Sequence, residues 1–543
     1  MPTAVQPLIN TLQKLTGEIL TKQSDQKPTF ERNMLQTAKG GGFLAAGSLF
    51  EFGIRFVIAF LLARVLGAAE YGMYNLAISA AVIVASISAL GMDDGMIRYI
   101  AMMVGQRDEK GVWGTLQIGF GIGMAMSLVT GVGLYLLAEP VGLHIFHEPD
   151  LVPLLRIFSF IIPPLTLSNI LVGAARGFKR MDYSALAENV IQFVIRLVLI
   201  GILALLGLNV FMASIVFGLS ELAATLALIY LLHKQFSFKR PIREARRDTR
   251  EIFTFALPFW MSGLLSKFRK NIQAVLLGTF NTVAGVGVFA IVSSINLVGR
   301  VSYQSIIASV KPFLAELHSQ GNIKQMGQLY QTTTRWTLMT NLPIFLIMVL
   351  FPEQLLIIFG ESFVVGASAL AILAYAELAN AGTGICGSII DMTGYTKLKL
   401  VNSVVWVLLL SVTNVLLIPP WGVVGAAVAT LISTTTINLL RVAEVWFLFR
   451  LQPYNRTFLK PVAAGVGAYF SAQLLAQWFS ADATLVHAIL HMAFVVIVYT
   501  GLSLLLRLSP EDKVVLLSLN DRAAVLLARG RARLNGRLPA QSG

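Results

Sequence analysis

Long apolar stretches alternate with short polar breaks along most of this 543-residue chain. A bilayer core about 30 Å thick is crossed by about 20 apolar residues at 1.5 Å rise per residue, and fourteen stretches meet this requirement. The pattern therefore predicts an all-α integral membrane protein with about 14 transmembrane helices. They are expected at 41–66, 72–100, 113–138, 151–173, 183–207, 210–232, 252–279, 283–309, 336–352, 362–391, 399–418, 422–449, 461–478 and 484–506.

Lysine and arginine are unequally distributed between the polar breaks. Of the 42 basic residues, 32 lie in the tails and in alternate connections, and none lies in the remaining seven connections. Basic loops resist translocation and stay in the cytoplasm. We therefore expect a multi-pass protein of the plasma (inner) membrane with cytoplasmic N- and C-termini.

The composition agrees with a membrane protein, since 56% of the residues are hydrophobic, 13% are charged and the mean hydropathy is +0.73. A net charge of +14 would suggest nucleic acid in a soluble domain, but here the basic loops are expected to meet anionic lipid headgroups, and no nucleic-acid partner is expected. The single cysteine, Cys386, excludes an intramolecular disulfide. The first 40 residues lack a cleavable signal pattern, so the first span is expected to act as the insertion signal.

An internal repeat with an offset of about 211 to 217 residues divides the chain. Leu66-Gly67 followed by Tyr71-Gly72-Met73-Tyr74 recurs as Leu277-Gly278 followed by Val286-Gly287-Val288-Phe289. Each repeat holds six predicted spans, so both start on the same side of the membrane. Two parallel six-helix lobes with a cavity between them follow from this count.

The predicted organisation has six parts. A cytoplasmic amphipathic N-terminal tail (1–40) precedes the first six-helix lobe (41–233), and a basic cytoplasmic linker (234–251) leads to the second six-helix lobe (252–450). Two extra C-terminal transmembrane helices (451–507) and a basic cytoplasmic tail (508–543) complete the chain.

Four cations near the middle of predicted spans define the first candidate site. Lys267, Arg269 and Lys270 lie in 252–279, and Arg300 lies in the next span in a polar stripe with Ser293, Asn296, Tyr303 and Gln304. A cation at mid-helix costs about 2.5–3.5 kcal/mol, so it must face a wet cavity or a partner. One hypothesis is that these four cations bind an anionic substrate; the alternative is that they pair with Glu377 or Asp391 of the span 362–391. Neutralising an isolated cation would leave protein abundance unchanged, whereas breaking a pair would reduce it.

The first lobe carries further candidates. Arg55 lies four residues from Glu51, so it either pairs with it or binds substrate. Arg196 is too far from Glu188 on its helix for a direct pair and is a second cavity candidate. Glu221 has no cation on its own helix, so it is either a Na⁺ or H⁺ site or the partner of Arg196.

The remaining acids are candidates for ion coupling. Asp93 and Asp94, near Arg98, either bind a coupling cation or anchor their helix, and Glu377 is a further possible coupling site. His144 and His147 lie beside Glu148 and Asp150 in an outer loop and are interpreted as solvated residues. We expect no metal and no cofactor other than possible Na⁺ or H⁺ coupling.

The run from Arg64 to Tyr74, with Leu90-Gly91-Met92 and Arg98-Tyr99-Ile100-Ala101, resembles the start of polysaccharide and oligosaccharide-lipid exporters. These belong to the multidrug/oligosaccharidyl-lipid/polysaccharide exporter superfamily. The resemblance implies a flippase that moves a polyprenyl-diphosphate-linked oligosaccharide from the inner to the outer leaflet by alternating access in surface polysaccharide biosynthesis. It also implies membrane lipids and glycan-assembly proteins as partners. The final two helices are similar in position to those that form a lipid-tail groove in related lipid II flippases.

A transporter, and not an enzyme, is therefore the expected function. An inside-negative potential favours outward movement of an anion by about 2.3 kcal/mol per charge per 100 mV. One alternative is a multidrug/cation antiporter of the same superfamily, whose cavity is expected to favour acids. Another is a membrane glycan polymerase or ligase, but such an enzyme needs a sizeable outer loop. The longest outer connection here has about a dozen residues and no basic residue.

Overall fold

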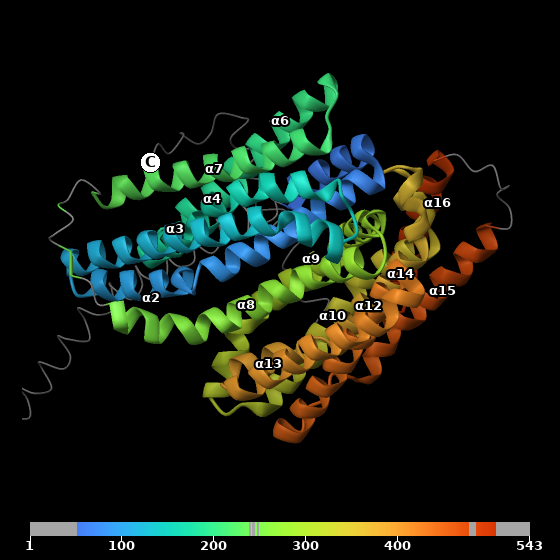
Figure 1. Ribbon diagram of the computed structural model, residues 1–543. Coiled ribbons are helices and arrows are strands. Elements are labelled where there is room, and N and C mark those ends of the chain that lie inside the picture. The colour runs from blue at the N-terminus through green and yellow to red at the C-terminus, as the bar shows by residue number, and fades with distance from the viewer. Residues whose placement is uncertain (1–51, 238–240, 242–244, 247–248, 477–484, 507–543) are drawn as a thin grey trace, which may run out of the picture. The chain divides into compact units, whose positions relative to one another are not determined.

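The computed structural model describes residues 52–506 except 238–240, 242–244, 247–248 and 477–484, and it omits some side chains of 249–270. The predicted amphipathic and basic tails lie outside the described residues. Helices account for the regular structure of the described residues, and no strand occurs among them (Figure 1). The all-α prediction is confirmed.

The described part of the chain contains ten helices that are long and apolar enough to cross a membrane. Every one of the fourteen predicted spans overlaps a described helix. The numbers differ partly because some helices cover two predicted spans. α14 (Thr396–Phe449) comprises two helices, which match the predicted spans 399–418 and 422–449 and meet at a kink at Gly422, where φ is 53° and ψ is −126°. The first helix (Phe52–Ser88) similarly passes through Gly67, where φ is 71°.

The chain divides into two compact units. Unit 1 runs through Leu66 and from Met73 to Val275, and unit 2 comprises Gly67–Gly72 and the chain from Leu276 onward. The sequence repeat placed the whole span 252–279 in the second lobe, whereas α8 (Thr249–Phe280) lies in unit 1 as far as Val275. The lobe boundaries drawn from the repeat stay a prediction.

The main helices of unit 1 are α2 (Met92–Gly105), α3 (Glu109–Pro140), α4 (Leu151–Gly177) and α7 (Val210–Gln235). Of these, α4 packs against the other three (Figure 1). A π-helical turn (Val141–Ile145) ends α3. The predicted span 183–207 is formed by three consecutive segments: α5 (Met181–Ala185), a π-helical turn (Leu186–Ile191) and α6 (Gln192–Leu206).

Within unit 1, α8 lies in close contact with the backbone around Ser86 and Gly91. A Cβ at Gly91 would overlap the Ala256 carbonyl, and the Trp260 indole N–H donates to the Ser86 carbonyl at 3.0 Å. Gly91 has φ 73° and separates the first helix from α2, so the predicted span 72–100 is broken there. A left-handed residue without a side chain gives both the break and the room for α8.

Unit 2 contains α9 (Val283–Ser319), α10 (Ile323–Leu350), α12 (Ala367–Thr383) and α14, with α12 packed against the other three. The shorter helices are α11 (Pro352–Ile357), a 3₁₀ turn (Glu361–Gly366), α13 (Cys386–Met392) and a second 3₁₀ turn (Arg456–Phe458). α15 (Leu459–Ala476) and α16 (Leu485–Leu505) pack on each other and on α10 through a core that includes Leu342, Ala468 and Tyr499 (Figure 1).

Two glycines that the repeat aligns meet in unit 2. A Cβ at Gly72 would overlap the Val283 carbonyl and lie 3.0 Å from the Gly287 nitrogen. Reciprocally, a Cβ at Gly287 would overlap the Ala68 carbonyl and lie 2.9 Å from the Gly72 nitrogen. The first helix and α9 therefore cross in backbone contact at equivalent positions of the two repeats.

Candidate functional site

Arg300 and Glu377 form the central ion pair of unit 2. The Arg300 Nη2 and Nε atoms lie 2.8 and 2.9 Å from Glu377 Oε1. The Glu377 side chain is 6% exposed, whereas that of Arg300 is 46% exposed. The carboxylate is therefore buried, and part of the guanidinium stays open. This is the pairing that the structural alternative for Arg300 describes.

Two asparagines extend the Arg300–Glu377 pair across three helices. Asn380 Nδ2 donates to Glu377 Oε2 at 3.1 Å, and Asn438 Nδ2 donates to Asn380 Oδ1 at 2.5 Å. The chain Arg300–Glu377–Asn380–Asn438 thus joins α9, α12 and α14. Each oxygen of the buried carboxylate has a donor, as a buried charge requires.

A small cavity of about 10 Å³ lies beside this pair, lined by Asn296, Asn341 and Glu377 among others. This volume corresponds to about one water molecule. Asn296 is 5% exposed, and its Oδ1 has no hydrogen-bond partner among the described residues. Of the predicted polar stripe, Asn296 thus lies in the core and Arg300 is partly open. The Tyr303 hydroxyl donates to the Gly384 carbonyl at 2.9 Å.

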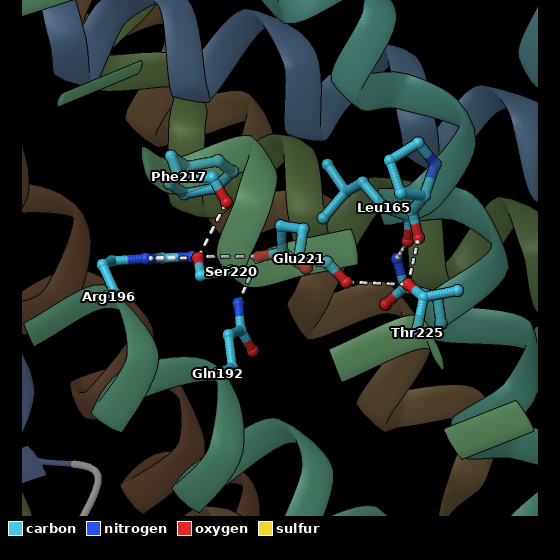
Figure 2. Close-up of polar contacts among 9 residues, drawn as sticks. Leu165, Gln192, Arg196, Phe217, Ser220, Glu221 and Thr225 are labelled. Carbon is cyan, nitrogen blue, oxygen red and sulfur yellow. Dashed lines mark hydrogen bonds and ion pairs between the residues drawn. The ribbon is translucent and has the colours of Figure 1, made fainter. Parts of the chain in front are cut away.

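Unit 1 contains a second buried pair between α6 and α7. Figure 2 shows Arg196 directed at Ser220 and Glu221, with Gln192 on the same carboxylate. Arg196 Nη2 lies 3.2 Å from Glu221 Oε1, and Arg196 Nε donates to Ser220 Oγ at 2.9 Å. The two side chains are 8% and 5% exposed. Glu221 is therefore the partner of Arg196, which is one of the two alternatives drawn from the sequence.

Aromatic rings surround the Arg196 guanidinium. It lies 4.1 Å from the Phe217 ring centroid and 5.3 Å from that of Phe193. The Arg55 guanidinium lies 5.1 Å from the centroid of the same Phe193 ring, and the Arg55 side chain is exposed. Cations over aromatic faces are stabilised by the ring quadrupole. Glu51, the other partner considered for Arg55, lies outside the described residues.

The structure places the other candidates as follows. Lys267 Nζ lies 3.7 Å from Asp93 Oδ2 in unit 1, and each side chain is 30% exposed. The side chains of Arg269 and Lys270 lie outside the described residues, so the predicted grouping of Lys267, Arg269, Lys270 and Arg300 stays a prediction. Asp94 is partly buried beside Asp93. Asp391 pairs with Lys399 at 3.2 Å, and Glu188 pairs with Arg176 at 3.6 Å.

Sequence reasoning missed the partners that complete these sites. It did not single out Asn380 or Asn438, although asparagine inside an apolar span is itself a signal of a polar contact. It also did not connect Lys267 with Asp93, which lies 174 residues earlier. Among the described residues, no three metal-ligating side chains come together.

These features define a multi-pass α-helical membrane protein with a buried carboxylate paired to an arginine in each compact unit. Residues 37–318, about half of the chain, match the family described as polysaccharide biosynthesis protein, and residues 258–416 match the MatE family. The chain belongs to the polysaccharide biosynthesis protein family. The superfamily resemblance noted in the sequence is confirmed.

Individual relatives are distant. The chain is 23% identical over 228 residues to the probable low-salt glycan biosynthesis flippase Agl15 of Haloferax volcanii, covering 42% of this chain and 45% of that protein. It is 23% identical over 313 residues to the probable flippase AglR of the same organism, covering 57% and 63%. The chain thus spans about half of the length of these curated relatives.

The fold is also found in a solved structure. The lipid II flippase MurJ in an inward closed conformation superimposes with a TM-score of 0.69 at 14% identity, covering 85% of this chain and 97% of that one. At this identity the likeness concerns the fold alone.

Proposed function

We propose that the protein flips a polyprenyl-diphosphate-linked oligosaccharide from the inner to the outer leaflet by alternating access, in surface polysaccharide biosynthesis. Membership of the polysaccharide biosynthesis protein family supports this proposal, as do the two relatives named as probable flippases. The protein acts as a transporter and not as an enzyme. Its location is the plasma membrane, with both termini in the cytoplasm, and glycan-assembly proteins are its partners.

The observation that carries the proposal is the half-open guanidinium of Arg300. An arginine that is 46% exposed in an apolar helix, with one side fixed by a buried carboxylate, keeps donors available for a second anion. Phosphate oxygens are the acceptors that arginine binds best, often in a bidentate geometry. Arg300 is thus oriented by Glu377 and able to contact the diphosphate. Arg196 is too buried to serve in the same way in this conformation.

Ion coupling belongs to the same proposal. The candidate coupling acids Glu221, Glu377 and Asp93 each lie within 3.7 Å of a cation. Protonation of such an acid, or Na⁺ binding to it, would weaken its hold on the cation and free the cation for the substrate. Glu377 is the preferred coupling residue, because its partner Arg300 is the exposed one.

Deleting the gene in its native host tests the function. We expect loss of the surface polysaccharide together with accumulation of the lipid-linked oligosaccharide on the cytoplasmic leaflet, where an added membrane-impermeant glycosidase cannot reach it in intact spheroplasts. Lipid-linked units that accumulate within reach of the glycosidase would indicate a polymerase or ligase instead. An unchanged surface polysaccharide would contradict both.

The antiporter alternative retains one specific observation, the match of residues 258–416 to the MatE family. An antiporter for cationic drugs needs open acids, whereas in the described part of unit 2 Glu377 is buried under Arg300. The same deletion strain separates the two functions. Increased sensitivity to cationic dyes with normal surface polysaccharide would favour the antiporter.

A further inference from the structure

An apolar groove lies on the surface of unit 1 between α3 and α4. It has a volume of about 260 Å³ and is lined by Ser127, Leu128, Gly131, Val132 and Tyr135 of α3 and by Ser159, Phe160 and Pro163 of α4. Leu128, Val132 and Tyr135 recur at helical spacing and form one wall. A Cβ at Gly131 would lie 2.9 Å from the Ser159 carbonyl, so the two helices meet closely at this point.

The two serine side chains that line the groove have no hydroxyl proton available for a polar ligand. The Ser127 hydroxyl donates to the Met124 carbonyl at 2.9 Å, and the Ser159 hydroxyl donates to the Arg156 carbonyl at 2.6 Å. Both hydroxyl protons are therefore used within their own helices. Phe160 is 73% exposed and Val132 is 58% exposed, so the groove opens outward. Its occupant must be apolar over the length of the groove.

Two opposite charges stand at one end of the groove. Arg156 lies one turn before Phe160, its guanidinium is 5.5 Å from the centroid of the Tyr135 ring, and its Nη2 is 3.5 Å from Glu139 Oε2. The Arg156 and Glu139 side chains are 43% and 63% exposed, so their mutual attraction is weak. Arg156 Nε has no hydrogen-bond partner among the described residues. This Nε atom is buried, so it is through the exposed parts of the Arg156 and Glu139 side chains that both charges can bind a further partner.

The depth of these residues along α4 matches the layers of a lipid. At 1.5 Å per residue from Leu151, Arg156 lies about 8 Å and Pro163 about 18 Å along the helix. The charged pair thus falls near the headgroup layer, and the apolar groove falls within the hydrocarbon core, which is about 30 Å thick.

We propose that this groove binds one phospholipid with a zwitterionic, ammonium-bearing headgroup, a phosphatidylethanolamine. One acyl chain lies along the α3–α4 groove, the phosphate accepts hydrogen bonds from Arg156, and the ammonium donates to Glu139. A cation and an acid side by side complement a phosphate and an ammonium. The acid would repel the uncompensated charge of an anionic lipid, and a choline headgroup has no N–H to donate. The site is independent of the proposed transport function.

Native mass spectrometry tests the lipid preference on the wild-type protein. Delipidated protein receives equal amounts of phosphatidylethanolamine, phosphatidylglycerol and phosphatidylcholine with matched acyl chains. We expect one molecule of phosphatidylethanolamine to be retained preferentially. Equal retention of the three lipids, or preference for phosphatidylglycerol, would overturn the proposal.

Variants locate the site. Val132→Trp fills the groove and should abolish preferential retention, whereas Val198→Trp on α6, at a position that is 52% exposed, should not. Glu139→Gln should reduce the preference over phosphatidylglycerol by up to about fivefold, as expected for one exposed charge pair. Glu361→Gln, at another exposed glutamate, is the charge control. Unchanged preference in both Val132→Trp and Glu139→Gln would place the lipid elsewhere.

Discussion

Arg300 is held by Glu377 on one side and is open on the other, so its replacement has two separable effects. Arg300→Gln should abolish glycan export, and it should also destabilise the protein because Glu377 is left buried without its cation. The loss should be about 1–3 kcal/mol, below the about 3–5 kcal/mol of a fully buried pair, since the guanidinium is half exposed. Membrane-fraction abundance and surface glycan measure the two effects.

The double variant Arg300→Gln/Glu377→Gln distinguishes these effects. Neutralising both partners should restore abundance, because no uncompensated charge remains, but it should not restore export. Recovery of export in the double variant would show that Arg300 does not contact the substrate. For an isolated cation, neutralising Arg300 would leave the abundance of the protein unchanged. Because Arg300 is paired with Glu377, that expectation does not apply.

Arg196 and Glu221 provide the fully buried comparison. Arg196→Gln should cost about 3–5 kcal/mol because both side chains are less than a tenth exposed, and Gln192 cannot neutralise the remaining charge. Thermal unfolding of the purified protein should show the loss, and adding Glu221→Gln should recover most of it. A single variant as stable as the wild type would mean that Glu221 is protonated in the folded protein.

For individual residues, the cations inside the membrane could be predicted from the sequence, but only some of their ion-pair partners could. Arg300 and Arg196 could be identified because a cation in an apolar helix has a known cost. Their acids, Glu377 and Glu221, lie 77 and 25 residues away on other helices, so the sequence could offer the pairings only as alternatives. The contact between Lys267 and Asp93 depends on how α8 packs, which no spacing rule gives.

At the scale of elements, the crossing of the first helix with α9 depends on two glycines. Gly72→Ala and Gly287→Ala should each destabilise the protein by about 1–3 kcal/mol, since each new methyl group meets backbone atoms that cannot rotate away. Gly201→Ala in α6 is the control, because a Cβ there meets nothing within 4 Å and should be neutral or stabilise the helix. Thermal unfolding of the three variants checks this. Equal behaviour of Gly72→Ala and Gly201→Ala would contradict the close crossing.

Helix boundaries show what periodic hydrophobicity can and cannot give. Apolar length predicted where helices occur, because the bilayer sets that length. It separated 399–418 from 422–449 correctly, since two helices meet at the kink at Gly422, but it did not predict the break at Gly91, which interrupts an otherwise apolar run. Leu90 and Gly91 both have positive φ at this break, and composition averaged over a window does not register such a local change of backbone direction.

At the scale of the whole molecule, the distribution of basic residues assigns a side to each connection, and α9 offers a direct test of it. Asn281 precedes α9 and Gln320 follows it, and both are exposed. Cysteine at Asn281 should react with a membrane-impermeant maleimide added to intact cells. Cysteine at Gln320 should react only after the membrane is opened, because Lys311 near the end of α9 and Lys324 at the start of α10 make this side basic. Cys386, the one native cysteine, is 2% exposed and should stay unlabelled in both cases, so the wild-type protein is the background control. Labelling of both positions from the same side would mean that α9 does not cross the bilayer, and the reversed pattern would place the basic connections outside and overturn the proposed inward location of both termini.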